Sequence, residues 1–440
     1  MIKTKAGAAE IIRTLKGRGF AAYLVGGCVR DSLLGLAPAE WDITTSARPD
    51  EVSKSFDKTV PTGLDYGTVT VLLADGPYEV TTFRSDENYV DGRHPGNVRF
   101  TDDIHKDLSR RDFTINALAA DPETGLLIDD FHGQQDLKDR TIRSVGDPVA
   151  RFSEDGLRPV RACRFAAKLE FIIEDNTFAA IPKALPIVKK VAVERLHDEL
   201  VKMMGAARPS IGLELMRKSG LLKIILPELE ACYGVSQPPA FHKYDVYWHS
   251  LYACDAAPPN DPVLRLAILL HDIAKPPCKV DETFYNHDQA GAVMAEDLLK
   301  RLKFSGADIE RIAGLVANHM FDYTEKWSDA AVRRFLRRIG GVDNVADLFA
   351  LRRADVAAMI KVNDGSYLLE LQKRVEKIVA EENALNVNDL KIDGHDVMKT
   401  LDLLPGPRVG QILNDLLEKV LDDPGLNNRE TLLRLIKAHA

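Results

Sequence analysis

The chain has 440 residues, about three times the length of one typical domain, so two to four domains are expected. Hydrophobic residues make up 45% and charged residues 28%, which are ordinary globular values and exclude a disordered, collagenous or coiled-coil chain. The 58 Lys and Arg against 66 Asp and Glu give a net charge of −8, and an acidic chain lacks the basic footprint usual for nucleic-acid binding.

The sequence carries no sign of export or membrane insertion. Its first twenty residues contain no apolar segment with a small-residue cleavage site, and the apolar run at 266–270 is far too short for a membrane span. The five cysteines are odd in number and form no C-x-x-C pair. We therefore expect a reduced, soluble, cytoplasmic protein with no membrane partner and an unknown oligomeric state.

Strand and helix signals alternate over the first 150 residues. In chain order the patterns predict a helix over 8–16, a strand over 22–25, a helix over 30–34, strand 41–45, helix 49–56, and strands 68–73 and 78–84 around a turn at 75–76. The polar segment 85–97 predicts a mobile loop. Beyond about residue 150, long helical periods replace this pattern, so an α/β head with a mixed sheet is followed by an all-α body.

Two glycines, Gly26 and Gly27, lie between a predicted strand and a predicted helix. Glycines let the backbone approach an anion, and the free N–H groups at a helix start favour phosphate. Arg30, in the first turn of that helix, would hold a triphosphate through two N–H groups. The alternative is that the glycines only make a tight turn, which is the commoner case.

Three carboxylates open neighbouring predicted strands. Glu40 and Asp42 are two residues apart, so on a strand their side chains point the same way, and Glu79 opens the strand 78–84. Carboxylates grouped in this way hold Mg²⁺, and paired ions serve nucleotidyl transfer by activating a hydroxyl and neutralising pyrophosphate. The alternative for an E-x-D pair is a solvated strand end.

A basic stretch follows the head. Asp155, Arg158, Arg161 and Arg164 recur every three residues, which predicts one broad face of a helix, in a segment with five basic residues against two acidic ones. Cytosine and adenine both present an amino donor beside a ring-nitrogen acceptor, so a carboxylate with a guanidinium, here Asp155 with Arg158, would accept C and A and reject U and G. The alternative is a solvated charged helix.

These motifs occur in a specific order. G-G-x-V-R-D-x-L-L-G, E-x-D, E-V-T-T-F-R, R-R-D-F-T-I-N-A-L-A (110–119) and E-D-x-x-R-x-x-R together resemble the class II tRNA nucleotidyltransferase and poly(A) polymerase family. The resemblance implies that Glu40 and Asp42 bind Mg²⁺ with Glu79 in support. It implies nucleotide contacts from Gly26, Gly27, Arg30, Arg111, Asp112, Arg161 and Arg164, and base selection by Asp155 and Arg158. Because the family usually has Asp-x-Asp, the first ligand, Glu40, is a departure.

The segment 84–100 retains a D-G-R-H-P stretch (91–95) that is typical of family members that add the terminal A. Members restricted to adding C tend to lack this flexible loop. The resemblance therefore favours a complete CCA-adding enzyme.

The body carries most of the eleven histidines. An adjacent His271-Asp272 at the end of a very apolar predicted helix, with His249 upstream and Asp355 downstream, resembles the HD metal-dependent phosphohydrolase superfamily. The resemblance implies a site for Ni²⁺, Mn²⁺, Fe or Mg²⁺, with His287 and His319 available to a second ion, and hydrolysis of a phosphoester such as a cyclic phosphate at a damaged RNA end. For each histidine alone, a buried hydrogen-bonded side chain is the commoner outcome.

Two further features are less specific. Arg333, Arg334, Arg337 and Arg338 form a basic helix edge, which is as consistent with RNA backbone contact as with simple solvation. The segment after 385 resembles the family's tRNA-approaching tail, with its P-G-P-x-x-G turn at 405–410. Its His395-Asp396 pair lacks suitably spaced partners, so we assign it no metal.

The resemblances together imply an α/β nucleotidyltransferase head followed by an all-α neck, HD and tail body, and CCA addition to tRNA from CTP and ATP with release of pyrophosphate. The expected domains are a head (1–145), a neck (146–238), an HD domain (239–375) and a tail (376–440). The alternatives are a poly(A) polymerase or an A-adding or CC-adding enzyme with the same head, an RNA-end phosphohydrolase that uses the head for docking, and a pure tRNA-binding protein. The last alternative would require both carboxylate sets to be idle. The acidic net charge does not argue against an RNA substrate, because carboxylates are the catalytic groups of this chemistry.

Overall fold

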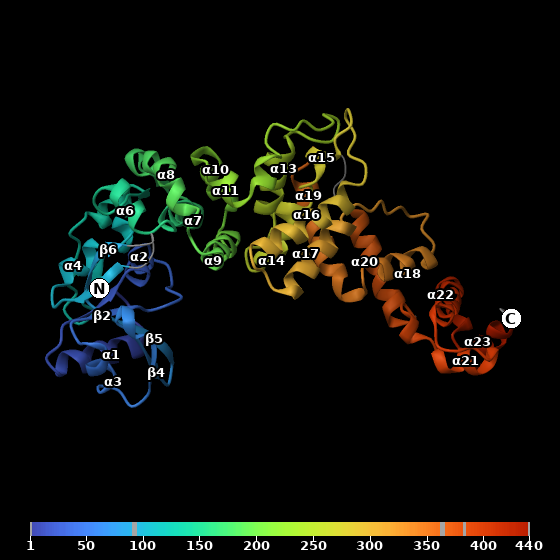
Figure 1. Cartoon of the computed structure of the whole chain (residues 1–440), viewed down its shortest axis with the longest axis horizontal. Helices are drawn as coiled ribbons and strands as arrows, with labels where there is room; N and C mark the ends of the chain where they lie inside the picture. The colour runs from blue at the N-terminus through green and yellow to red at the C-terminus, as the bar shows by residue number, and fades with distance from the viewer. Residues whose placement is uncertain (1, 90–94, 361–365, 382–383, 439–440) are drawn as a thin grey trace. The chain divides into compact units, whose positions relative to one another are not determined.

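The computed structural model describes residues 2–89, 95–360, 366–381 and 384–438. The chain divides into two compact units, Met1–Pro227 and Glu228–Ala440 (Figure 1). The first is built around a mixed sheet and the second is helical, which confirms the predicted fold class. No helix in the described ranges is long and apolar enough to cross a membrane.

A seven-stranded sheet with the order β3-β4-β5-β2-β1-β8-β9 forms the centre of the first unit. Its strands are β1 (Ala22–Val25), β2 (Ile43–Thr45), β3 (Thr59–Gly63), β4 (Thr68–Leu73), β5 (Gly76–Thr82), β8 (Ala119–Ala120) and β9 (Leu127–Ile128). Strand β2 pairs antiparallel with β1 and parallel with β5, so the ends of β1, β2 and β5 that carry the predicted site residues meet at one edge.

Helix α1 (Ala6–Gly17) covers part of this sheet, against β1, β2 and β5 (Figure 1). Its apolar residues recur at helical spacing, and Ile11, Ile12 and Leu15 are fully buried. Burying a side chain of this size contributes about 1.5–3 kcal/mol relative to exposure. The face of the sheet that α1 covers is therefore filled by apolar side chains. The predicted site residues lie instead at the ends of β1, β2 and β5.

The segment predicted as a mobile loop is a β-hairpin instead. Strands β6 (Arg84–Tyr89) and β7 (Pro95–Phe100) pair antiparallel, from Arg84 opposite Phe100 to Tyr89 opposite Pro95. The prediction was wrong because cross-strand pairing overrides a polar composition. The tip, with most of the D-G-R-H-P stretch, lies outside the described residues.

Helices complete the first unit and predominate beyond residue 145. They are α2 (Gly27–Leu33), α3 (Pro49–Ser53), α4 (Ile104–Ser109), α5 (Gly133–Lys138), α6 (Pro148–Glu154), α7 (Arg158–Leu169), α8 (Asp175–Val188), α9 (Val193–Met204), α10 (Pro209–Ser219) and α11 (Leu221–Ile225). Short pieces add η1 (Leu64–Tyr66), η2 (Thr114–Asn116), β10 (Thr141–Ile142) and β11 (Ile172–Ile173). Helix α7 packs against α9 and α10.

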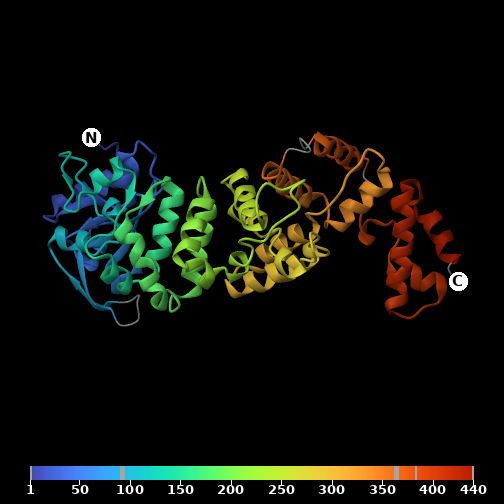
Figure 2. The same cartoon turned by 90° about the horizontal axis from the view of Figure 1, so that it is seen from above.

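The second unit begins within α12 (Pro227–Glu230) and is helical. Its elements are α13 (Val246–Ala256), α14 (Pro262–Leu270), α15 (Lys275–Cys278), α16 (His287–Arg301), α17 (Gly306–Asn318), α18 (Asp329–Arg338), η3 (Val342–Asn344), α19 (Val345–Ala357), α20 (Ser366–Ala380), η4 (Val387–Asp389), α21 (Gly394–Leu401), α22 (Pro407–Asp422), η5 (Pro424–Leu426) and α23 (Arg429–Lys437). Helix α14 packs against α13, α17 and α19, whereas α21, α22 and α23 pack together near the C-terminus (Figures 1 and 2).

The predicted four-part division remains a prediction. The break between the two units falls at 227, inside the expected neck, and the expected start of the tail at 376 falls inside α20. A boundary at that position would cut a continuous helix.

Candidate functional site

The predicted carboxylates lie at the edge of the sheet. The ladder between β1 and β2 ends at Leu24 opposite Ile43. Strand β2 therefore begins at Ile43 and not at residue 41 as predicted, and Glu40 and Asp42 precede it. The parallel register of β2 with β5 sets Ile43 opposite Val80, and Asp42 therefore lies beside Glu79. All three carboxylates line one cavity of about 370 Å³.

The electrostatics of this group favour a bound cation. Burial raises the pKa of Asp42 to about 6; Arg111 opposes the shift, and the charges of Glu79 and Glu40 add to it. The two neighbouring carboxylates make Asp42 harder to ionise, an effect that a divalent cation would reverse. Hard oxygen ligands gathered in this way suit Mg²⁺.

The glycine turn lies next to the carboxylates. Gly26 has a φ of +72°, which favours glycine, and a Cβ there would lie 3.1 Å from Nη1 of Arg111. Arg111 donates to Asp107, and its buried Nε has no hydrogen-bond partner among the residues the structure describes. Arg30 is instead buried beneath the turn, where it donates to Asp31 and to Asn116 at 2.7 Å.

The predicted base-reading pair lies at a helix break. Helix α6 ends at Glu154, Asp155 is extended, and α7 starts at Arg158, so the four residues do not share one helix face as predicted. Both Asp155 oxygens accept from Arg195, at 3.0 and 2.7 Å. Arg158 donates to Glu154 and to two backbone carbonyls.

The other predicted nucleotide ligands form a buried ion network. Arg161 donates to Asp112 at 2.8 and 2.6 Å, and Arg164 donates to Glu199. Burial alone would raise the pKa of Asp112, but Arg161 holds it well below its usual range. Glu199 and Arg195 were not predicted; their spacing of four residues, which places both on one face of α9, was the available signal.

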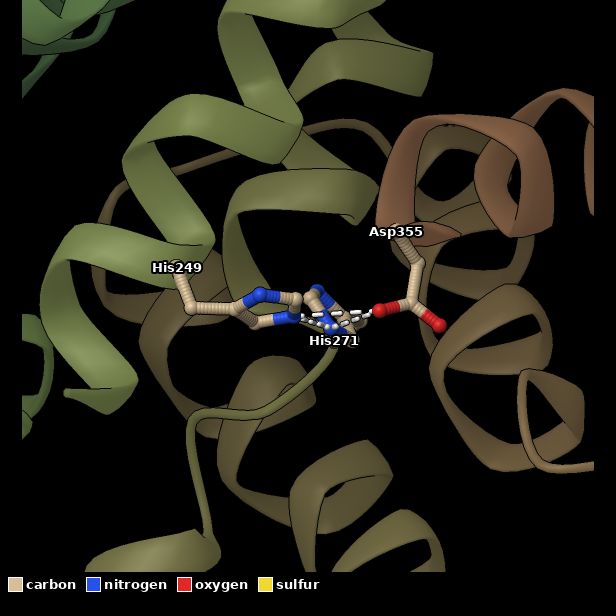
Figure 3. A group of neighbouring side chains, drawn as sticks. All are labelled: His249, His271 and Asp355. Atoms are coloured by element: carbon tan, nitrogen blue, oxygen red, sulfur yellow. Dashed lines mark hydrogen bonds and ion pairs between the residues drawn. The ribbon is translucent and has the colours of Figure 1, made fainter. Parts of the chain in front are cut away.

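The second unit brings together all six residues of the predicted HD set. His249, His271 and Asp355 come from α13, the end of α14 and α19, and converge as Figure 3 shows. His249 Nε2 lies 3.0 Å from Asp355 Oδ1 and 3.3 Å from His271 Nε2. All three side chains are buried.

The second set is Asp272, His287 and His319, which are also buried. Asp272 faces both sets: its Oδ2 lies 3.2 Å from His271 Nε2, and its Oδ1 lies 3.3 Å from His287 Nε2. Burial opposes ionisation of Asp272, but His271 and Lys275 hold its pKa well below its usual range. One charged carboxylate thus lies between two clusters of potential ligands.

The imidazole orientations are those of metal ligands. The Nδ1 atoms of His271, His287 and His319 each lie 2.6–2.7 Å from a backbone carbonyl, so each ring carries its proton on Nδ1. The Nε2 atoms of His287 and His319 face each other across 3.3 Å. A proton on one Nε2, or a cation between the two rings, would satisfy this close approach.

The cluster opens into a cavity of about 330 Å³. Lys275 and Arg352 line it, and each forms an ion pair at 2.6 Å with a carboxylate of the cluster, Asp272 and Asp355 respectively. Two cations beside the carboxylates suit an anionic substrate such as a phosphoester.

The predicted basic helix edge is an internal contact. Arg333 is buried and donates to the carbonyl of Leu421, while Arg334 and Arg337 both pair with Glu418 of α22. These contacts pair the charges of Arg334 and Arg337 with the neighbouring helix, and RNA-backbone contact by this edge stays a prediction. Elsewhere in the tail, the Asp396 carboxylate accepts from Arg429.

Three family models match successive parts of this chain. Residues 22–143 match the poly A polymerase head domain, 170–233 the probable RNA and SrmB-binding site of polymerase A, and 287–436 a putative tRNA nucleotidyltransferase domain 2. The order of these matches is that of a nucleotidyltransferase.

Relatives that are similar over nearly their whole length narrow the nucleotidyltransferase class to one family. The CCA-adding enzyme of Enterococcus faecalis is 33% identical over 98% of this chain and 95% of its own length, and that of Lactococcus lactis is 33% identical over 98% and 96%. The crystal structure of Bacillus stearothermophilus CCA-adding enzyme in complex with CTP matches with a TM-score of 0.76 and 28% identity over 99% of this chain and 98% of that one. The chain belongs to the family of CCA-adding enzymes.

Proposed function

We propose that this chain adds C, C and A in turn to the 3′ end of tRNA, from CTP and ATP, with release of pyrophosphate. The observation that carries the proposal is the convergence of Glu40, Asp42 and Glu79 on one cavity beside the Gly26 turn, in a chain related to CCA-adding enzymes over its whole length. Neither half of this observation would suffice alone, because the same kind of head serves several polymerases.

Mg²⁺ is the expected ion of the head, because the three carboxylates are hard ligands and repel one another without a cation. Bound there, it would activate the attacking hydroxyl and neutralise charge on the leaving pyrophosphate. The chain's own contribution is to hold the triphosphate on the Gly26 turn and on Arg111, whose Nε is free to donate.

Base selection is assigned to Asp155 and Arg158. Asp155 accepts from the base amino group and Arg158 donates to the ring nitrogen, so C and A are accepted without a nucleic-acid template. Arg195 holds the Asp155 carboxylate through both oxygens, which fixes its plane. Arg161 and Arg164 support this arrangement through Asp112 and Glu199.

Substitution of one carboxylate tests the assignment. Asp42→Ala is expected to abolish CMP incorporation while CTP still binds, and Asp50→Ala, an exposed carboxylate of α3, is the matched control with normal activity. Incorporation at the wild-type rate by Asp42→Ala would refute the metal assignment.

We also propose a second activity: metal-dependent hydrolysis of a phosphoester at the six-residue centre of the second unit. The observation that favours it is the close approach of two Nε2 atoms, of His287 and His319, beside Asp272. The candidate ions are Ni²⁺, Mn²⁺, Fe and Mg²⁺, and a bound ion would supply an activated water. Lys275 and Arg352 would hold the phosphate.

Metal analysis and kinetics test this second activity separately from CCA addition. The purified protein is expected to retain close to two divalent ions. It is also expected to hydrolyse a 2′,3′-cyclic nucleotide to its monoester, or to release phosphate from that monoester. Asp272→Ala is expected to lose both properties and to keep CCA addition. A wild-type protein that binds no divalent ion after exposure to Ni²⁺ or Mn²⁺ would contradict the proposal.

A further inference from the structure

The second unit contains a cavity that neither proposed activity uses. Its volume is about 300 Å³, and residues of α17 line it from Ala307 to Asn318 at spacings of three and four positions, which is one face of that helix. Ile339, directly after α18, and Asn344 and Leu348 complete the lining. None of the six predicted metal ligands contributes to it, so this cavity is separate from the histidine centre.

The α17 wall of the cavity is open at Gly314. A Cβ built on this residue would meet no side chain or neighbouring segment within 4 Å. Its φ does not lie in the left-handed region, so the backbone does not require glycine there. The buried side chains of Leu315, Ile339 and Leu348 provide the apolar part of the lining. The missing side chain at Gly314 therefore leaves room for a ligand above an apolar surface.

The one cation of the lining, Arg311, is already neutralised. Its guanidinium donates to Asp347 at 2.7 Å and to Asp261 at 2.6 Å. These two hydrogen-bonded carboxylates raise the pKa of Arg311 above its usual value. With two carboxylates against one guanidinium, the wall beside Arg311 does not favour an anionic ligand.

Oxygen atoms are the groups that the lining leaves available. The Asn318 side chain donates to the carbonyl of Gly314, and the Asn344 side chain donates to that of Ile339, so the Oδ1 atom of each amide is left to accept. Glu310 is exposed and forms no ion pair within the described ranges. A carboxylate and two amide oxygens suit a ligand that donates hydrogen bonds and carries positive charge.

The spacing of these oxygens indicates the shape of the ligand. Glu310 and Asn318 are eight residues apart on α17, about 12 Å along the helix axis, so one ammonium group cannot contact both. Asn318 is also the last residue of α17, where the helix dipole favours a cation. Gly314 and Leu315 lie between the two ends. Two ends that suit cations, joined by an apolar strip, match a linear chain of methylenes with an amine at each end.

We propose that this cavity binds a linear aliphatic polyamine of about the length of spermidine, laid along α17. One terminal ammonium donates to the Glu310 carboxylate, and the other donates to Asn318 Oδ1 at the end of the helix. The methylenes between them cover Gly314 and Leu315. The site uses no residue of the head and none of the metal centre, so it is independent of both proposed activities.

Two diamines of equal charge and unequal length test the proposal. Saturation-transfer NMR titrations of the full chain without tRNA measure the Kd of 1,8-diaminooctane and of 1,4-diaminobutane. Non-specific attraction to an acidic protein is the same for both dications. The longer diamine is expected to bind at least tenfold more tightly, because it reaches both ends and buries more methylenes. Equal Kd values would overturn the proposal.

Matched substitutions locate the binding. Gly314→Leu fills the cavity without a clash and is expected to raise the Kd of 1,8-diaminooctane at least tenfold, whereas Gly410→Leu, at a helical glycine of α22 with the same open space, leaves it unchanged. Glu310→Gln is expected to raise this Kd about fivefold, and Glu296→Gln, an exposed carboxylate of α16 outside the cavity, to have no effect. An unchanged Kd in Gly314→Leu, or an equal effect of Glu310→Gln and Glu296→Gln, would overturn the placement of the ligand.

Discussion

Replacing the central carboxylate of the head by its neutral isostere is expected to stabilise the protein while abolishing its activity. The folded pKa of Asp42 is about 6, against an ordinary value of 3.8. At about 1.36 kcal/mol per pH unit, this difference corresponds to an upper limit of about 3 kcal/mol. Because Asp42 is partly exposed, solvent screening reduces the expected gain in Asp42→Asn to about 1–2 kcal/mol at pH 7.5.

The pH dependence fixes the sign of this effect. A raised folded pKa means that the folded state binds more protons than the unfolded state, so the contribution is fully present below pH 4 and is lost as the pH rises through 6. The advantage of Asp42→Asn over the wild type should therefore shrink by about half between pH 7.5 and pH 5. Mg²⁺ at tenfold over its Kd should stabilise only the wild type, by about 1.4 kcal/mol.

The assay is urea denaturation at both pH values, followed by tryptophan fluorescence. Trp41 is the sole tryptophan of the first unit, so a Trp248→Phe, Trp327→Phe background reports unfolding of the head. CMP incorporation is measured on the same samples. Equal stability of the two proteins at pH 7.5, or equal stabilisation of both by Mg²⁺, would refute the reasoning.

Three further predictions concern the turn, the base pocket and the tail. Gly26→Ala places a Cβ 3.1 Å from Nη1 of Arg111 at a φ of +72°, which costs about 1–2 kcal/mol of backbone strain. The Kd of CTP, measured by calorimetry, should therefore rise about tenfold. Asp155→Ala should lose the preference for CTP and ATP over UTP and GTP in competition assays, and retained discrimination would contradict selection by the protein. Arg334→Ala removes exposed pairs with α22, so the free energy of unfolding should change by less than about 1 kcal/mol and the Kd of tRNA should stay unchanged.

Much of the head was predictable because its elements are short and separated by clear turn signals. Strand 22–25 and the turn at Asp75 and Gly76 agree with the structure, since apolar runs and turn residues are local properties. The grouping of histidines was predictable from the HD resemblance, because the apolar helix α14 ends at Leu270, directly before the buried His271.

The remaining features depend on contacts that the sequence does not encode locally. The partners of Asp155 and Arg164 are Arg195 and Glu199, 40 and 35 residues away, and nothing local to either motif identifies them. Likewise, the partner of Arg334 is Glu418, 84 residues distant. In each of these cases the partner of the side chain is set by a long-range charge pair, which local helix or strand propensity does not reveal.

The most direct test of the central claim is the ending that the protein gives to a tRNA lacking CCA. With CTP alone the product is expected to grow by two C residues, with ATP alone to stay unextended, and with both to stop after C, C and A. A run of A residues, an ending limited to CC with both nucleotides present, or addition of A alone would contradict the account and indicate a poly(A) polymerase, a CC-adding or an A-adding enzyme.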